Sequence, residues 1–317
     1  MRIAILDDFS NLAPSFARWD SLAPAQVTFF SDHLESEAAL VERLKPFDAI
    51  GLMRERTPMP RSLIEKLPQL KFLITTGKQN ASIDVKAAAD HGVVVSGTNS
   101  PGHATAELAF LMIMAQARRL LPNVVDLRER GAWQTELGQD CRGKTLGILG
   151  LGRLGAQLAK LGKAIGMNVI AWSQNLKPED CAAQGVEYVD KATLFARSDF
   201  VSIHLRLSER TRGLVGAAEL AALGPNAYLV NTSRAEIVDQ QALLAALDGN
   251  SLGGVATDVY VSEPVAADTE RLIAHPRALC TPHVGYVTRE TYEIFYSEMV
   301  EGLAAWLNGA PIRVITP

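Results

Sequence analysis

Runs of apolar, often β-branched residues alternate with segments of helical periodicity along almost the whole chain, and this alternation constrains the fold more than any other feature. In the N-terminal third the strand-like runs are 3–6, 27–30, 49–53, 72–75 and 93–95. Helical patterns separate most of them, for example at 35–44 and 61–67. Strand–helix–strand repeats pack as parallel βαβ units, so the pattern predicts an α/β fold with parallel sheets.

A second alternating series begins at Thr145. Its strand-like runs are 146–149, 168–172, 200–204, 227–231 and 253–257. Its helical patterns are 154–165, 191–196, 217–222 and 240–247, the last with Asp239 in the N-cap position, and a final helix is expected at 289–307. Two such series in a chain of 317 residues predict two α/β domains of ordinary size.

An apolar stretch precedes the second series. We expect one helix from His103 to Leu120, buried between domains or between subunits because it is apolar on most sides. Its most hydrophobic part, 104–117, is too short to span a bilayer and contains Glu107 and Gln116. No membrane segment is therefore expected.

Composition argues against several other classes of partner and location. The net charge is only −4 and no long basic run occurs, so nucleic acid is not an expected partner. The apolar N-terminal run is broken by Asp7 and Asp8, which argues against a secretory signal. The cysteines, Cys141, Cys181 and Cys280, lie far apart without a CxxC pair, so neither disulfides nor a metal site is expected. These features predict a cytoplasmic protein with reduced thiols.

The sequence Gly-Leu-Gly-Arg-Leu-Gly, which begins at Gly150, follows a predicted strand and opens a predicted helix. In that context a GxGxxG pattern predicts dinucleotide binding. Gly150 allows a tight turn, Gly152 lets the backbone approach the pyrophosphate, and Gly155 lets the helix pack close to the strand. The N–H groups at the start of the helix, around Arg153 and Leu154, then face the phosphates. We therefore expect NAD or NADP as the cofactor.

The end of the next strand bears on the choice between these two cofactors. NAD-binding domains carry an acidic residue there, which binds the ribose hydroxyls, but this chain has Ser173 followed by Gln174. A serine does not repel a 2′-phosphate, which slightly favours NADP. No arginine follows directly, and Lys177 and Arg206 are the candidate phosphate partners. The choice between NAD and NADP stays open at this point.

Three polar motifs follow three of the later predicted strands and contain Arg234, Glu263 and His283. The motifs are 231–239, 258–264 and 281–286. Ligands of open α/β sheets bind beyond the carboxyl ends of strands. An arginine, a glutamate and a histidine converging there would supply an anion clamp, an orienting carboxylate and a proton carrier.

Taken with segments 104–108, 131–133, 201–204 and 211–213, these motifs resemble the D-isomer-specific 2-hydroxyacid dehydrogenase family, and within it the glyoxylate and hydroxypyruvate reductases. The resemblance covers most of the chain. It implies an NAD(P)-dependent oxidoreductase that acts on the CH–OH group of a small D-2-hydroxy acid or on the corresponding 2-keto acid.

The resemblance also implies roles for single residues. Arg234 would bind the substrate carboxylate with its planar fork and polarise the carbonyl. His283 would give a proton to the carbonyl oxygen as hydride reaches the carbon. Glu263 would hold the imidazole and favour its protonated form. Further cofactor contacts are implied for Thr105, Leu205, Arg206, Thr211, Thr232, Ser233, Asp258 and Gly285.

The chain departs from the family's commonest pattern in its substrate loop. Gly77 matches, whereas Lys78 and Gln79 do not. Backbone N–H groups of this loop hold the carboxylate in the family and survive side-chain changes, so substrate binding is still expected here. Arg54, at the end of a predicted strand, is a second candidate substrate contact. Tyr286, a bulky residue beside the histidine motif, would narrow the pocket.

The implied architecture is a pair of Rossmann-like domains with a cleft between them. A flavodoxin-like substrate domain would span 1–98, a doubly wound NAD(P)-binding domain would span 99–286, and residues 287–317 would return to the first domain as a C-terminal helix. Closure over the cleft would exclude water. A homodimer through the helix from Ala104 to Leu120 is expected.

An alternative function belongs to a different class. Some relatives of this fold are NAD(H)-sensing corepressors that bind peptides, and the resemblance implies that these proteins keep the arginine, glutamate and histidine. Failure to convert any 2-keto acid would favour this alternative. The sequence leaves open the physiological substrate, the metabolic pathway and the oligomeric state beyond a dimer.

Overall fold

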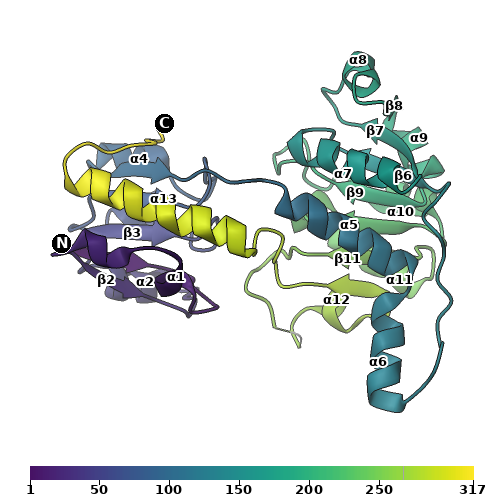
Figure 1. The fold of residues 1–317 in the computed structure, drawn as a ribbon, viewed down its shortest axis with the longest axis horizontal. Helices are drawn as coiled ribbons and strands as arrows, with labels where there is room; N and C mark the ends of the chain where they lie inside the picture. The colour runs from purple at the N-terminus through teal and green to yellow at the C-terminus, as the bar shows by residue number, and fades with distance from the viewer. Residues whose placement is uncertain (267) are drawn as a thin grey trace. The chain divides into compact units, whose positions relative to one another are not determined.

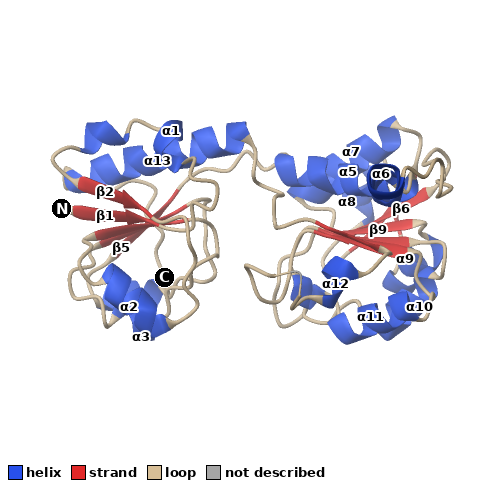
Figure 2. Ribbon diagram, turned by 90° about the horizontal axis from the view of Figure 1, so that it is seen from below, coloured by secondary structure: helices blue, strands red, loops and turns tan. Residues whose placement is uncertain are grey.

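The computed structural model describes residues 1–266 and 268–317, and they form two compact units. The first unit contains Met1–Pro101 and Val287–Pro317, and the second contains Gly102–Tyr286. Each unit is built on one parallel sheet with helices on both faces (Figure 1, Figure 2). This architecture confirms the α/β class predicted from the alternating pattern.

The first unit has five strands in the order β2-β1-β3-β4-β5. They are β1 (Arg2–Ile5), β2 (Gln26–Phe29), β3 (Ala49–Leu52), β4 (Phe72–Thr75) and β5 (Val94–Gly97). The helices are α1 (Ala13–Phe16), η1 (Trp19–Leu22), α2 (Glu37–Leu44), α3 (Arg61–Ile64), α4 (Val85–Asp90) and α13 (Arg289–Leu307). Every position of β3 and β4 is buried because helices cover both faces of the sheet.

The last helix of the chain, α13, completes the first unit. Its bounds confirm the predicted helix at 289–307, and the Thr288 side chain caps it by accepting from the N–H of Thr291. Trp306 stacks on Phe72 of β4 with ring centroids 5.0 Å apart. A Cβ at Gly302 would lie 2.5 Å from Ile74 of the same strand, so glycine lets α13 approach the sheet closely.

The second unit has seven strands in the order β12-β11-β10-β9-β6-β7-β8. They are β6 (Thr145–Leu149), β7 (Asn168–Trp172), β8 (Glu187–Tyr188), β9 (Phe200–Ile203), β10 (Tyr228–Asn231), β11 (Gly254–Thr257) and β12 (Ala278–Cys280). The helices are α5 (Ala104–Ala117), α6 (Leu120–Arg130), α7 (Arg153–Ala164), α8 (Pro178–Ala182), α9 (Lys191–Arg197), α10 (Ala217–Leu223), η2 (Ala235–Ile237), α11 (Gln240–Asp248) and α12 (Arg271–Ala274). The strand order reverses between β6 and β9, which places a topological switch point at the carboxyl ends of these strands.

The single helix expected from His103 to Leu120 is wrong. Helix α5 ends at Ala117, Arg119 adopts a left-handed conformation with φ 47°, and α6 starts a new direction. Helix α5 packs within its own unit, where the buried Gln116 side chain donates to the carbonyl of Val255. Helix α6 has no buried residue.

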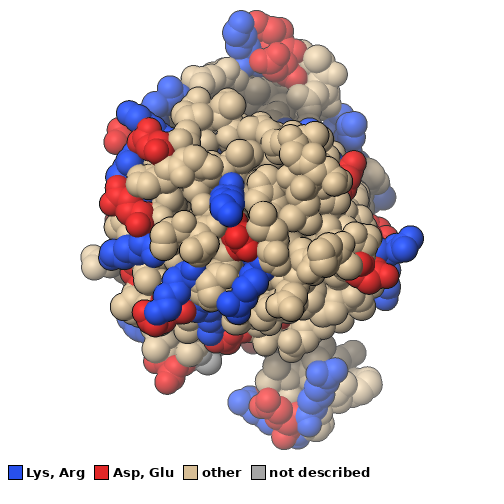
Figure 3. All heavy atoms as spheres, turned by 90° about the vertical axis from the view of Figure 1, so that its left-hand side faces the viewer, with Lys and Arg blue, Asp and Glu red and all other residues tan. Residues whose placement is uncertain are grey.

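The lengths of the helices bear on membrane insertion, and the charged side chains bear on the character of the surface. Within the described residues no single helix is both long and apolar enough to cross a membrane, although α5 and α6 meet those two criteria jointly across a bend of 64°. On the face drawn in Figure 3, acidic and basic side chains lie near one another and leave broad uncharged areas between them.

Candidate active site

The centre of the second unit's site is an imidazole held by a carboxylate. Nδ1 of His283 lies 2.6 Å from Oε2 of Glu263, and the two side chains are 20% and 17% exposed. The other carboxylate oxygen accepts from the backbone N–H of Tyr260 at 2.9 Å. Glu263 is therefore fixed at both oxygens, and its bond to Nδ1 fixes the orientation of the His283 ring.

The turn that carries His283 is held by Asp258, which directly follows β11. Asp258 is 1% exposed, and its carboxylate accepts from the Thr281 hydroxyl at 2.6 Å and from the N–H groups of Val284 and Gly285 at 2.7 and 2.8 Å. Burial raises the pKa of this carboxyl, against the lowering effect of its hydrogen bonds. Asp258 thus organises the histidine turn, in which His283 itself has a left-handed φ of 53°.

Two further residues named from the sequence lie against this turn. The Thr105 hydroxyl donates to the carbonyl of Gly285 at 3.0 Å, which links the start of α5 to the turn. The Tyr286 ring stands edge-on to the His283 ring with centroids 5.7 Å apart. The structure therefore brings Thr105, Asp258 and Gly285 together, although they are far apart in sequence.

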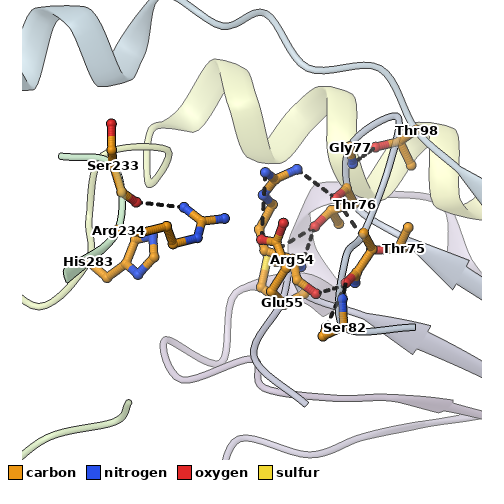
Figure 4. Close-up of polar contacts among 12 residues, drawn as sticks. Arg54, Glu55, Thr75, Thr76, Gly77, Ser82, Thr98, Ser233, Arg234 and His283 are labelled. Carbon is orange, nitrogen blue, oxygen red and sulfur yellow. Dashed lines mark hydrogen bonds and ion pairs between the residues drawn. The ribbon is translucent and has the colours of Figure 1, made fainter. Parts of the chain in front are cut away.

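Arg234 lies in the turn after β10. Its Nη1 donates to the carbonyl of Ser233 at 2.7 Å (Figure 4). The side chain of Asn231 closes the turn, because it accepts from the N–H of Ser233 and donates to the carbonyl of Arg234. The Ser233 hydroxyl donates to the carbonyl of Ile203, so its bond in the structure is to the neighbouring strand.

In the first unit, Arg54 and Gly77 lie in contact. Nη1 of Arg54 donates to the carbonyl of Thr76 at 3.1 Å (Figure 4). A Cβ at Gly77 would lie 1.9 Å from the same nitrogen, and the φ of Gly77 is 94°, so this position requires glycine. The Asn80 side chain donates to the carbonyl of Arg54 at 2.6 Å and thereby fixes the loop, a role that the sequence reasoning missed.

The remaining loop residues differ in exposure and in whether their polar groups are already hydrogen-bonded. The side chains of Lys78 and Gln79 are exposed. The N–H of Gly77 donates to the Thr98 hydroxyl at 2.8 Å, so this backbone donor is already used within the unit. Arg54, which also lies 3.7 Å from the carboxylate of Glu55, is consequently a cation that the loop region holds in a defined position.

The glycine-rich turn after β6 fits a bound dinucleotide. A Cβ at Gly150 would lie 2.8 Å from the carbonyl oxygen of His204, and one at Gly155 would lie 2.1 Å from that of Gly150, so packing explains both glycines. A Cβ at Gly152 would meet nothing within 4 Å, so the second glycine instead keeps open space clear. Helix α7 begins at Arg153, followed by Leu154, and the first-turn N–H groups of a helix have no intrahelical acceptor.

Two buried polar atoms at neighbouring strand ends also fit a ligand. Oγ1 of Thr232, after β10, and Nδ1 of His204, after β9, have no hydrogen-bond partner among the described residues. The opposite nitrogen of His204 lies 2.9 Å from the Ser202 hydroxyl, and burial lowers the pKa of the ring to about 4. The ring is therefore neutral at pH 7 and suits an uncharged polar group.

A hollow of about 340 Å³ lies beyond the end of β7. It brings together five residues named from the sequence with three others: Ser173, Gln174, Asn175, Leu205, Arg206, Ser208, Arg210 and Thr211. The Thr211 hydroxyl donates to the carbonyl of Arg206 and shapes one wall. Arg210 was missed because its place in the hollow depends on a loop conformation that no sequence pattern specifies.

Comparisons with known proteins agree with this geometry. A family model described as D-isomer specific 2-hydroxyacid dehydrogenase, NAD binding domain, matches residues 110–285. The chain is 36% identical over 283 residues to the glyoxylate reductase of Thermococcus litoralis, which covers 85% of this chain and 83% of that protein.

Solved structures of similar proteins match this chain over nearly its full length. A putative D-3-phosphoglycerate dehydrogenase oxidoreductase from Ralstonia solanacearum superposes with a TM-score of 0.93 at 34% identity, covering 100% of this chain and 97% of that one. A phosphoglycerate oxidoreductase from Vibrio cholerae gives 0.92 at 38% identity, covering 98% and 100%.

The chain therefore belongs to the D-isomer-specific 2-hydroxyacid dehydrogenase family, which confirms the resemblance seen in its motifs. It is an NAD-binding oxidoreductase of the class that transfers hydride between a nicotinamide cofactor and a 2-keto or 2-hydroxy acid.

Proposed function

We propose that this protein reduces a small 2-keto acid to the D-2-hydroxy acid with NAD(P)H, using His283 as the proton donor. The observation that carries the proposal is the 2.6 Å contact between His283 and Glu263. A carboxylate at Nδ1 fixes the tautomer and orientation of the ring, and so the direction of Nε2. This is the arrangement that a reversible proton donor requires.

The chemistry divides between the cofactor and the side chains. The nicotinamide supplies a hydride to the carbonyl carbon when it is bound. His283 gives the proton from Nε2 to the carbonyl oxygen, so one hydride and one proton complete the alcohol. Arg234 binds the carboxylate through its planar guanidinium and draws electron density from the adjacent carbonyl.

The substrate that we propose is glyoxylate or hydroxypyruvate. The glyoxylate reductase of Thermococcus litoralis supports a short substrate. Arg54 and Gly77, with Lys78 and Gln79 beside them, are the proposed substrate contacts of the first unit. Tyr286, edge-on to the His283 ring, supports a narrow site.

Several finer features belong to the same proposal. NADP is slightly favoured over NAD because Ser173 stands where an acidic residue would bind the ribose. We further propose a cytoplasmic homodimer. Helix α6 supports dimerisation because it buries none of its residues. Its leucines Leu120, Leu121 and Leu127 are 50%, 44% and 49% exposed.

The test is the initial rate of NADPH and NADH oxidation with glyoxylate, hydroxypyruvate, pyruvate and phenylpyruvate. We expect turnover of at least one short acid, lost in the Arg234→Ala variant and partly kept in Arg234→Lys, which retains the charge without the fork. Tight cofactor binding without turnover of any acid would contradict the proposed reaction and favour a cofactor-sensing function.

A further inference from the structure

We propose that Arg210 binds the 2′-phosphate of NADPH and makes the cofactor site of this protein selective for NADPH over NADH. The inference rests on the proposed use of a nicotinamide cofactor and deepens it. It assigns cofactor choice to a residue of the loop after β9, distant in sequence from the strand end that carries Ser173.

The first observation is the charge of the hollow beyond β7. Arg206 and Arg210 are among its lining residues, and no aspartate or glutamate is. The hollow therefore has an excess of positive charge. Ser173, directly after β7, contributes a hydroxyl where an NAD-specific domain has a carboxylate. A dianionic phosphate would be attracted here, and nothing in the lining would repel it.

The second observation is how Arg210 is held. Its Nε donates to Oε1 of Gln174 at 2.8 Å, and its Nη2 donates to Oδ1 of Asn175 at 3.2 Å. Nε2 of Gln174 donates back to the carbonyl of Arg210 at 3.1 Å. Two hydrogen bonds thus tie the guanidinium, and a third ties the main chain of Arg210, to the residues that follow Ser173.

These partners orient the guanidinium but leave its charge intact. Amide oxygens are neutral, and among the residues that the structure describes no carboxylate pairs with Arg210. Arginines elsewhere in the unit differ, as Arg197 makes a two-nitrogen ion pair with Glu187 at 2.6 and 2.9 Å. Nη1 of Arg210 makes no hydrogen bond within the described residues, so both of its N–H groups remain for phosphate oxygens.

The two cations nominated from the sequence are weaker candidates. Lys177 does not line the hollow, and its ammonium lies 4.0 Å from Glu179. Arg206 lines the hollow and is exposed, as Arg210 is, but no hydrogen bond anchors the guanidinium of Arg206 among the described residues. Ordering a long exposed side chain costs conformational entropy, so the pre-oriented Arg210 should contribute more to phosphate affinity.

The experiment measures dissociation constants of NADPH and NADH by calorimetry, with no keto acid present. In the wild type we expect NADPH to bind more tightly. In Arg210→Gln we expect the NADPH constant to rise by about 10-fold to 100-fold, as for loss of a charge-assisted hydrogen bond, while the NADH constant changes by less than about 3-fold. Adenosine 2′,5′-bisphosphate should lose affinity as NADPH does, and 5′-AMP should not.

The matched control is Arg212→Gln, in the same loop. Arg212 is 60% exposed in its side chain, lies 3.9 Å from Glu236, and is not among the residues that line the hollow. The Arg212→Gln substitution should leave the dissociation constants of NADPH and NADH unchanged. Equal affinity of the wild type for the two cofactors, or equal weakening of both by Arg210→Gln, would overturn the inference.

The binding measurement and the keto-acid assay test the role of Arg210 and the proposed reaction independently. NADPH selectivity that depends on Arg210, found in a protein that converts no keto acid, would keep the inference and contradict the reaction. Turnover of a keto acid by a wild type that binds NADH as tightly as NADPH would support the reaction and contradict the role of Arg210.

Discussion

The position of His283 depends on a series of residues around its ring. Glu263 orients the imidazole, the N–H of Tyr260 orients Glu263, and Asp258 holds the turn through three hydrogen bonds. Replacing His283 therefore removes the proposed proton donor without removing the turn that supports it.

We expect the His283→Ala variant to lose turnover by about 100-fold to 10,000-fold, the usual size of general acid–base catalysis. Its cofactor dissociation constant should stay within about 2-fold of the wild type, since the glycine turn lies elsewhere. Steady-state kinetics and a direct binding titration measure the two effects. Wild-type turnover in this variant would remove His283 from the mechanism.

A second buried pair, in the first unit, predicts a pH-dependent stability. Nδ1 of His33 lies 2.8 Å from Oδ1 of Asp7, whose other oxygen accepts from the Thr57 hydroxyl at 2.7 Å. The hydrogen bond with Asp7 raises the pKa of His33 above its ordinary value of 6.5. A raised pKa in the folded protein means that the pair stabilises it fully below 6.5 and progressively less as the pH rises through the folded value.

The His33→Gln variant should therefore lose more stability at about pH 6 than at about pH 9. Urea unfolding of both proteins at each pH measures the difference in the free energy of unfolding. A difference that does not change with pH would show that the charge of His33 does not contribute.

Single residues could be nominated from the sequence where a motif marks them. Arg234, Glu263 and His283 each follow a strand in a recognisable pattern. Asn80 and Arg210 could not be nominated, because contacts distant in sequence set the conformation of the loops that position them. The expected place of Asp258 beside the cofactor stays a prediction, and its observed hydrogen bonds are to the histidine turn.

At the scale of elements, the glycines of the turn between β6 and α7 have two different roles, one in packing and one in the proposed cofactor binding. The surroundings of Gly152 and Gly155 differ, although both belong to one motif. We expect Gly155→Ala to destabilise the protein by about 1 to 3 kcal/mol, because its methyl group would overlap the carbonyl of Gly150. Gly152→Ala should leave stability nearly unchanged and weaken cofactor binding.

Thermal unfolding and a cofactor titration of the two variants check this contrast. Equal stability of both variants would contradict the packing role of Gly155, and unchanged affinity in Gly152→Ala would contradict the open space as a pyrophosphate site. The wild type serves as the reference for both measurements.

Elements were predicted best where the hydrophobic pattern is long. Helix α13 has the predicted bounds, and Asp239 caps α11 as expected. Strand β8 was not predicted because it contains only two residues, and the three residues of β12 were implied only by the motif that follows them. The break between α5 and α6 was missed because an apolar pattern continues across Arg119, whose left-handed conformation has no residue-type signal.

At the scale of the whole molecule, the exposed side chains around α6 predict an assembly. Trp133 and Leu137, in the segment after this helix, are 76% and 96% exposed. Exposed apolar groups of this size usually mark an interface. We expect a dimer at micromolar concentration, and a monomer when Leu127 and Trp133 are both changed to Asp.

Sedimentation velocity measures this assembly, with Tyr188→Asp as a control on the β8 edge of the same unit. Circular dichroism would show whether the double variant is folded. A monomeric wild type, or a dimeric and folded double variant, would contradict the interface. The strand orders of the two sheets could not be read from the sequence, because each sheet contains one pair of neighbouring strands that are not consecutive in the chain, β1 with β3 in the first unit and β6 with β9 in the second.

The second unit is an uninterrupted insertion in the first, and this has a consequence for synthesis on the ribosome. The first unit needs α13, which packs against α1, η1, β4 and β5. Its 287–317 segment is translated only after the whole of Gly102–Tyr286. The inserted unit can thus complete its sheet while the nascent first unit still exposes the apolar face that α13 covers. That face, around Phe72 and Ile74, is where we expect chaperones to bind the growing chain.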